Sequence, residues 1–202
     1  MQTTLLVARN ATPFVTPQEV AEHCRVTDEG EFGLLASIAE VAVAAVEDYT
    51  GLALTQNRYR WHSDSWPAAG QEIYPWYGRR PAVPRRAVLR RSPLISVEAV
   101  KYYDDEGAQV TVNPSNYYAD TVSPESGVVF KGSFSYPELV EDWRADRVTI
   151  DFTAGGGCID PRARQAVLLL CSHYYDNQGA VAPVALSEIP FSLQSLLTAI
   201  RI

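Results

Sequence analysis

Residues 147–177 read RVTIDFTAGGGCIDPRARQAVLLLCSHYYDN. In the first half, apolar and polar residues alternate: Val148, Ile150 and Phe152 share one side, which predicts a half-buried β-strand. Three glycines at 155–157 then end the strand, because glycine adopts turn conformations that other residues avoid. We therefore expect a β region to give way to a helical region within this segment.

The second half of the segment carries the signals of a helix. Asp160 is a suitable N-cap, and Pro161 fits the first helical position, where its missing N–H removes no hydrogen bond. Apolar residues then recur at helical spacing. This face consists of Ala163, Ala166, Val167, Leu170, Cys171 and Tyr174. We expect this strand–turn–helix to join a β domain to a helical bundle.

The N-terminal part begins with an arm of 14 residues that shows no clear period, and we expect it to be ordered only against a partner. Thr16, Pro17 and Glu19 then form a capping-box pattern, which predicts a short helix to about Arg25.

The longest predicted helix spans 28–50. Asp28 can cap it, with Glu31 three residues later, and Gly51 ends it. The expected apolar stripe consists of Leu34, Leu35, Ile38, Val41, Ala42, Ala45, Val46 and Tyr49.

Short strands with turn signals follow between 54 and 153. They are expected at 54–62, 72–74, 87–89, 95–103, 109–112, 117–119, 127–130 and 148–153. This spacing predicts a small antiparallel sheet or sandwich. The fold class is therefore α+β, with a helical bundle from both chain ends and an inserted antiparallel β domain. The expected divisions are 1–53 for the arm and first helices, 54–153 for the β domain, and 154–202 for the helices that complete the bundle with 15–53.

The composition is that of a globular protein, with 202 residues, 47% hydrophobic and 20% charged. No apolar run reaches membrane length and the N-terminus lacks a signal-peptide pattern, so we expect a soluble product. Three cysteines without a CxxC spacing argue against a disulfide framework or a zinc site. We expect no metal and no cofactor.

Candidate catalytic groups are weak. The glycines at 155–157 lie where phosphate loops lie, but no Lys-Ser/Thr follows and Asp160 would repel an anion. Residues 104–107 lack the spaced ligands of a calcium loop and read as a turn. No carboxylate pair lies in an apolar run that would tune its pKa. An enzyme that uses the glycine turn and Asp160 is retained as a rival hypothesis.

An arginine-rich segment is the most unusual local charge. It contains Arg79, Arg80, Arg85, Arg86, Arg90 and Arg91, with Trp76 and Tyr77 beside them. Arginines and aromatic rings together suit nucleic acid, but the same residues suit a subunit contact through arginine–carboxylate pairs, or simple solvation. The net charge of −7 argues against a protein that grips phosphates, although it does not exclude one that lets nucleic acid slide past.

Several segments, in order, resemble the head–tail connector (adaptor) family of long-tailed bacteriophages, which includes the adaptors of gene transfer agents. These are TPQEVA at 16–21, AAVEDYTG at 44–51, FTAG at 152–155, the stretch 159–173 with YYDN at 174–177, and IPF at 189–191. The resemblance spans nearly the whole chain and rests on order and spacing. The segment from about 64 to 91 looks longer than is common in the family.

The resemblance implies a structural protein of the virion neck, with no catalysis and no membrane. Such adaptors, assembled in the bacterial cytoplasm, form a ring, twelve-fold by resemblance, under the portal after DNA packaging. The ring continues the DNA channel, which duplex DNA passes without sequence-specific binding, and it docks the next neck or tail protein. The alternative is a small nucleic-acid-binding protein that uses the segment 79–91.

Three candidate surfaces follow. The resemblance implies portal docking by the C-terminal segment, through Ile189, Pro190, Phe191, Leu193, Leu196 and Leu197. Acidic walls repel a duplex and let it pass, so the predicted channel lining is Glu40, Glu47 and Asp48. The predicted subunit or partner contact consists of Trp76, Arg79, Arg80, Arg85 and Arg86.

Overall fold

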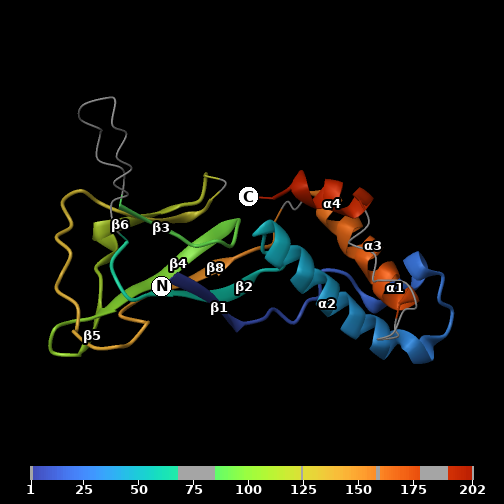
Figure 1. Cartoon of the computed structure of the whole chain (residues 1–202), viewed down its shortest axis with the longest axis horizontal. Coiled ribbons are helices and arrows are strands. Elements are labelled where there is room, and N and C mark those ends of the chain that lie inside the picture. Colours follow the sequence, from blue (N-terminus) through green and yellow to red (C-terminus); the bar gives the residue numbers. More distant parts are fainter. Residues whose placement is uncertain (1, 68–84, 124, 158–159, 178–190, 202) are drawn as a thin grey trace. The chain divides into compact units, whose positions relative to one another are not determined.

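The computed structural model describes residues 2–67, 85–123, 125–157, 160–177 and 191–201. It divides into two compact units (Figure 1). The β unit comprises Met1–Arg9 with Gln56–Gly155, and the helical unit comprises Asn10–Thr55 with Gly156–Ile202. The fold is therefore α+β. The observed division differs from the expected one at the N-terminus, where the first nine residues join the β unit.

The β unit contains two antiparallel sheets in the described residues. One has five strands in the order β1-β2-β8-β4-β5, and the other has three in the order β3-β7-β6. The strands are β1 (Gln2–Ala8), β2 (Asn57–Ser63), β3 (Arg85–Val88), β4 (Leu94–Tyr103), β5 (Gln109–Thr111), β6 (Tyr117–Asp120), β7 (Gly127–Phe130) and β8 (Val148–Ala154). The expected strand at 72–74 lies outside the described residues.

Strand β8 is the centre of the larger sheet, paired with β2 and β4. Its apolar side packs as predicted, with the Phe152 ring stacked on Tyr59 at 5.6 Å between centroids. The prediction that β8 is only half-buried is wrong, because Thr149 and Asp151 on the other side are buried as well. A central strand has neighbours on both edges, and their long polar side chains cover its second side.

Strand β1 corrects the prediction of an arm that needs a partner for its order. Residues Gln2–Ala8 pair with β2 in the same chain, with Leu5 opposite Arg60 and Leu6 opposite Tyr59. Residues 2–8 carry only a weak strand signal, because β1 is an edge strand that lacks a strict alternation. Its order comes from backbone pairing with a strand more than fifty residues away.

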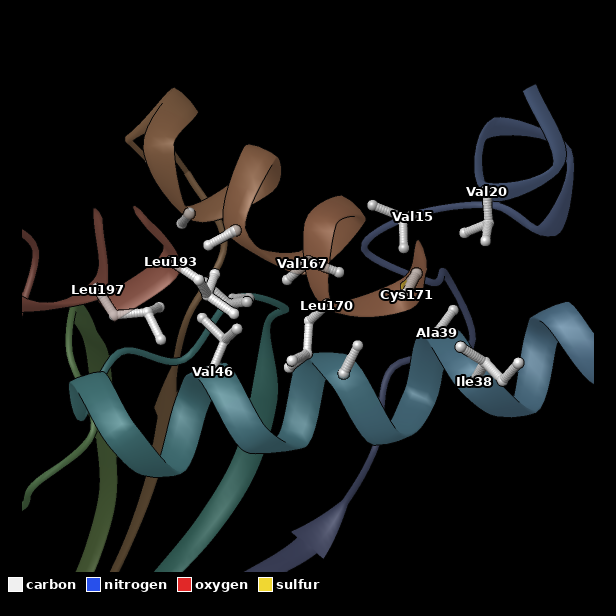
Figure 2. Packing of buried hydrophobic residues seen from close by; sticks show 14 of the residues in the cluster. Val15, Val20, Ile38, Ala39, Val46, Val167, Leu170, Cys171, Leu193 and Leu197 are labelled. Atoms are coloured by element: carbon white, nitrogen blue, oxygen red, sulfur yellow. The ribbon is translucent and has the colours of Figure 1, made fainter. Parts of the chain in front are cut away.

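In the described residues, the helical unit has four α-helices around one apolar core. They are α1 (Pro17–Cys24), α2 (Phe32–Thr50), α3 (Pro161–Asp176) and α4 (Phe191–Thr198). Figure 2 shows Val46 of α2, Val167 and Leu170 of α3, and Leu193 and Leu197 of α4 within this cluster. Each helix presents one apolar stripe, so burial of that stripe stabilises the unit.

Local capping signals define most of the helix ends. The capping box is confirmed: Thr16 Oγ1 accepts from Glu19 N–H, and Thr16 N–H donates to Glu19 Oε2 at 2.8 Å. Asp160 caps α3 by accepting from Arg162 N–H at 2.8 Å, and Gly51 closes α2 at φ 79°. The three glycines at 155–157 have φ values of 99°, 74° and 78°, which explains their place in the turn.

The start of the longest helix differs from the prediction. Asp28 caps a separate 3₁₀ turn, Glu29–Glu31, and α2 begins at Phe32. Glu31 does not reach back to form a capping box, because its Oε2 accepts a 2.6 Å hydrogen bond from Tyr175 Oη on α3. A contact distant in sequence thus replaces the local one.

Candidate functional site

The acidic residues of α2 have different environments. Glu40 and Asp48 are exposed, whereas Glu47 is half-buried and its Oε1 accepts a 2.7 Å hydrogen bond from Leu54 N–H. Glu47 therefore holds the connection that follows α2. Only Glu40 and Asp48 of the three predicted channel residues lie fully on the surface.

The exposed side of α2 is less polar than predicted. Leu34 and Val41, both assigned to the buried stripe, are in fact exposed, Val41 to 57%. They lie seven residues apart and so share one side of the helix. The predicted apolar stripe included too many residues, because a helix packed along one side buries only the residues nearest its neighbours. The surface beside Glu40 is therefore mixed apolar and acidic.

The predicted docking residues of the C-terminal segment also differ in how deeply they are buried. Leu193 and Leu197 are each only 2% exposed and lie in the helical core (Figure 2). Leu196 is half-buried. Ile189, Pro190 and the side chain of Phe191 lie outside the described residues. Among the described positions, two of the three leucines thus fasten α4 to its own chain, and Leu196 alone keeps a partly exposed side chain.

The arginine segment lies largely outside the described residues, including Trp76, Arg79, Arg80 and the side chain of Arg85. Arg86 is described, and it is engaged within its own sheet. Its Nη1 lies 2.8 Å from Asp120 Oδ2, and its Nη2 donates to the carbonyl of Glu125. This ion pair links β3 to β6, the two strands that flank β7. The prediction of Arg86 as a partner contact is thereby weakened, since its guanidinium stabilises the small sheet.

Two further features of the small sheet lie next to Arg86. The side-chain and backbone hydrogen bonds of Ser123, with a smaller contribution from Arg86, lower the pKa of Asp120 to about 2, so this carboxylate stays ionised. Opposite, Gly127 lies so close to β3 that a Cβ there would come within 2.5 Å of the Ala87 carbonyl. The glycine is required for this close approach.

A charged row across the larger sheet is absent from the sequence-based predictions. Arg60 Nε lies 2.6 Å from Asp151 Oδ1, and Lys101 Nζ lies 3.6 Å from Asp151 Oδ2. Burial raises the pKa of Asp151, but its hydrogen bond and ion pair with Arg60, aided by Lys101, lower the pKa more. Nothing in the sequence indicates this group, because its members come from three strands and meet only through strand register.

Groups suited to catalysis are not assembled in the described residues. Within the described ranges, no three His, Cys, Asp or Glu side chains lie together as a metal site would require. Burial raises the pKa of Cys171 to about 12, so this cysteine is a protonated, apolar thiol and not a nucleophile. Asp160 is occupied by capping α3 and by its ion pair with Arg162 at 2.6 Å. None of the described helices is long and apolar enough to cross a membrane.

Comparison with known proteins places the fold. No family model matches the chain, and no curated protein matches it by sequence. Among solved structures, a chain of the virion of a native gene transfer agent (GTA) particle aligns over 98% of this chain and 95% of its own length, with a TM-score of 0.70 and 22% identity. The fold is therefore that of a chain found in a phage-like particle.

Two further solved structures give a more specific likeness. A chain from the neck of a native GTA particle, computed with C12 symmetry, aligns over 98% of this chain and 94% of its own, with a TM-score of 0.67 and 23% identity. A chain from the neck of an empty GTA particle, computed with C6 symmetry, aligns over 98% of this chain and 95% of its own, with a TM-score of 0.68 and 23% identity. A likeness of this extent takes in both units of the chain.

Proposed function

We propose that this chain is a structural head-to-tail adaptor of a phage or phage-like particle. The observation that carries the proposal is the full-length fold likeness to chains of GTA necks, at 98% coverage of this chain. It agrees with the order of motifs that resembles the adaptor family. The proposed role needs neither catalysis nor a cofactor, and its location is the neck of the particle.

The proposed assembly is a ring, with twelve copies as the expected number. The neck structures that contain the similar chains were computed with C12 and C6 symmetry, and both symmetries accommodate a ring of twelve. A ring of identical subunits needs two different surfaces on each copy, because neighbours meet head to tail. We assign one of these contacts to the arginine segment, through Trp76, Arg79, Arg80 and Arg85, and omit Arg86 because of its pair with Asp120.

The ring would continue the DNA channel below the portal. A net charge of −7 favours passage of a duplex over its retention, because like charges repel. Glu40 and Asp48 are the proposed lining residues, since both are exposed on α2. Glu47 supports that helix end through Leu54 N–H.

The C-terminal segment is the proposed portal-docking element. Leu193 and Leu197 would act indirectly, by fastening α4 to the helical core, whereas Leu196 and the residues Ile189, Pro190 and Phe191 would meet the portal. Truncation of the segment would also remove two core leucines. Point variants Phe191→Ala and Leu196→Ala therefore test docking more cleanly.

The decisive experiment is sedimentation of the purified chain alone and then mixed with the cognate portal ring. We expect co-sedimentation in ring stoichiometry, and weaker co-sedimentation for Phe191→Ala and Leu196→Ala, with both variants still folded. A chain that stays unbound would contradict the adaptor function. Salt-dependent retention on duplex DNA, lost on Arg79→Glu and Arg80→Glu, would instead support the nucleic-acid-binding alternative.

A further inference from the structure

The side chain of Trp143 is fully exposed, at 104% of its reference area, on the connection between β7 and β8 (yellow to orange in Figure 1). Trp61, by contrast, is 1% exposed in the same unit. Tryptophan is the residue type most enriched among the side chains that dominate binding at protein interfaces. An indole in water is therefore a candidate anchor, if its loop is held in place.

The loop that carries Trp143, here called the Trp143 loop (residues 137–147), is fixed near both ends. Trp66 Nε1 donates to the Pro137 carbonyl at 2.9 Å, and Tyr103 N–H donates to the Arg147 carbonyl at 2.9 Å. Val140 N–H donates to the Tyr103 carbonyl at 3.2 Å. A loop held in this way loses little conformational entropy on binding, which favours affinity.

The residue after the indole is also held against the protein. The Arg144 guanidinium lies over the Tyr103 ring, 4.1 Å from its centroid, and its Nε lies 2.6 Å from Asp142 Oδ2. The Arg144 backbone N–H donates to the same carboxylate at 3.1 Å. The cation at position 144 is thus directed toward the chain, while its neighbour Trp143 projects into solvent.

The exposed charges of the loop are negative. Glu138, Glu141 and Asp146 are exposed, whereas the basic side chains are turned inward: Arg144 toward Tyr103, and Arg147, whose Nη1 donates to the Val140 carbonyl at 3.2 Å. The indole is therefore carried by a loop whose exposed charged side chains are acidic. An apolar pocket with a basic rim is the complementary surface, because the pocket takes up the ring and the rim attracts the carboxylates.

We propose that Trp143 is the anchor of a docking surface for a different protein, one that presents an indole-sized apolar pocket rimmed by arginine or lysine. A second copy of this chain is the less favoured occupant, because its arginine-rich segment is already assigned above to the contact between neighbours in the ring. Duplex DNA fits less well, because the acidic loop would repel its phosphates. The inference rests on the proposed function, and it names the partner as another protein of the neck.

The test uses the full-length chain and two separate probes, the cognate portal ring and the cognate protein that follows in the neck. Affinities are measured for the natural chain, Trp143→Ala, Trp143→Phe and Val122→Ala. We expect Trp143→Ala to weaken binding to one probe by about 30-fold or more. The affinity of Trp143→Phe should lie between the affinities of the natural chain and of Trp143→Ala. Val122 is 92% exposed on another loop of the β unit, and Val122→Ala should change affinity by less than about twofold.

A charge variant of the loop tests whether the partner's pocket has a basic rim. Glu141→Lys should weaken binding to the same probe, and the weakening should shrink as salt is raised, because exposed charges are screened. Unchanged affinity of Trp143→Ala for both probes would overturn the inference. So would loss of ring assembly in Trp143→Ala, since the occupant would then be a second copy. If the natural chain binds neither probe, the proposed function and this inference both fail. Measurements on the natural chain alone show that result, so it is distinct from a failure of the Trp143 inference, which only the variants show.

Discussion

The two units of the chain use their large apolar side chains differently. In the helical unit, Leu193 and Leu197 fill a core shared by four helices. Exposed large apolar residues of the described chain occur mostly in the β unit, at Leu5, Leu6, Val7, Ile95, Tyr118, Val122 and Trp143, with Leu34 and Val41 on α2. Apolar character alone therefore does not separate a stabilising residue from one offered to a partner. Burial makes that distinction, and matched pairs of variants can test it.

The largest effect is expected from a pair of tryptophans in the β unit. Trp61 is 1% exposed, so Trp61→Ala should lower the free energy of unfolding by about 3–5 kcal/mol, through lost burial and a cavity. Trp143→Ala should change it by less than about 0.5 kcal/mol, because the indole is fully exposed. Urea unfolding of both variants measures the difference. Equal losses would show that Trp143 is covered in the free chain, and burial would then not separate the two tryptophans.

A pair of leucines on α4 tests the same distinction in the helical unit. Leu193→Ala should cost about 2–5 kcal/mol, since Leu193 is only 2% exposed. Leu196→Ala should cost less than about 1 kcal/mol, because that side chain is half-buried. Thermal unfolding followed by circular dichroism reports both. If Leu196→Ala were the more damaging, the packed side of α4 would be wrongly assigned, and with it the docking role of Leu196.

The sequence predicted the local features of the fold well. The capping box at Thr16, the cap at Asp160 and the stop at Gly51 each depend on residues within a few positions, so they can be seen in one stretch. Apart from β1, the described strands were also found near their expected positions, since period-two alternation is a local property, and the expected strand at 72–74 stays a prediction. The α+β class follows from these two kinds of signal.

Features that depend on distant residues were missed. Strand β1 is ordered by pairing with β2, and Glu31 bonds to Tyr175 instead of capping a helix. The width of the buried stripe of α2 depends on which helices pack against it, and so Leu34 and Val41 were wrongly placed inside. For the candidate surfaces, residue type could suggest leucines and acids, but only the packed structure shows which of them remain exposed.

The charged row of the β unit should make stability depend on pH. The pKa of Asp151 is lowered on folding, so its contribution is present above the unfolded-state pKa and is lost as pH falls through the folded-state pKa. At pH 7, Asp151→Asn should cost about 1–3 kcal/mol, limited by the exposure of Arg60. The difference in unfolding free energy between Asp151→Asn and the natural chain should narrow from about pH 4 downward. Asp105→Asn, at an exposed turn position, is the matched control. A gap that stays constant with pH would exclude this ion pair as its cause.

The smallest effect is expected where the stabilising contact is most local. Thr16 Oγ1 accepts from Glu19 N–H at 3.2 Å, so Thr16→Ala should lower the free energy of unfolding by about 1 kcal/mol. Thr16→Ser keeps the hydroxyl and should retain most of that stability, which separates the hydrogen bond from packing of the methyl group. Urea unfolding of both variants measures the difference, and equal losses would assign the effect to the methyl group.

Because the cap and the ion pair of Asp151 lie in different units, the losses of unfolding free energy from Thr16→Ala and Asp151→Asn should add in a combined variant. A marked departure from additivity would mean that the two units do not respond independently.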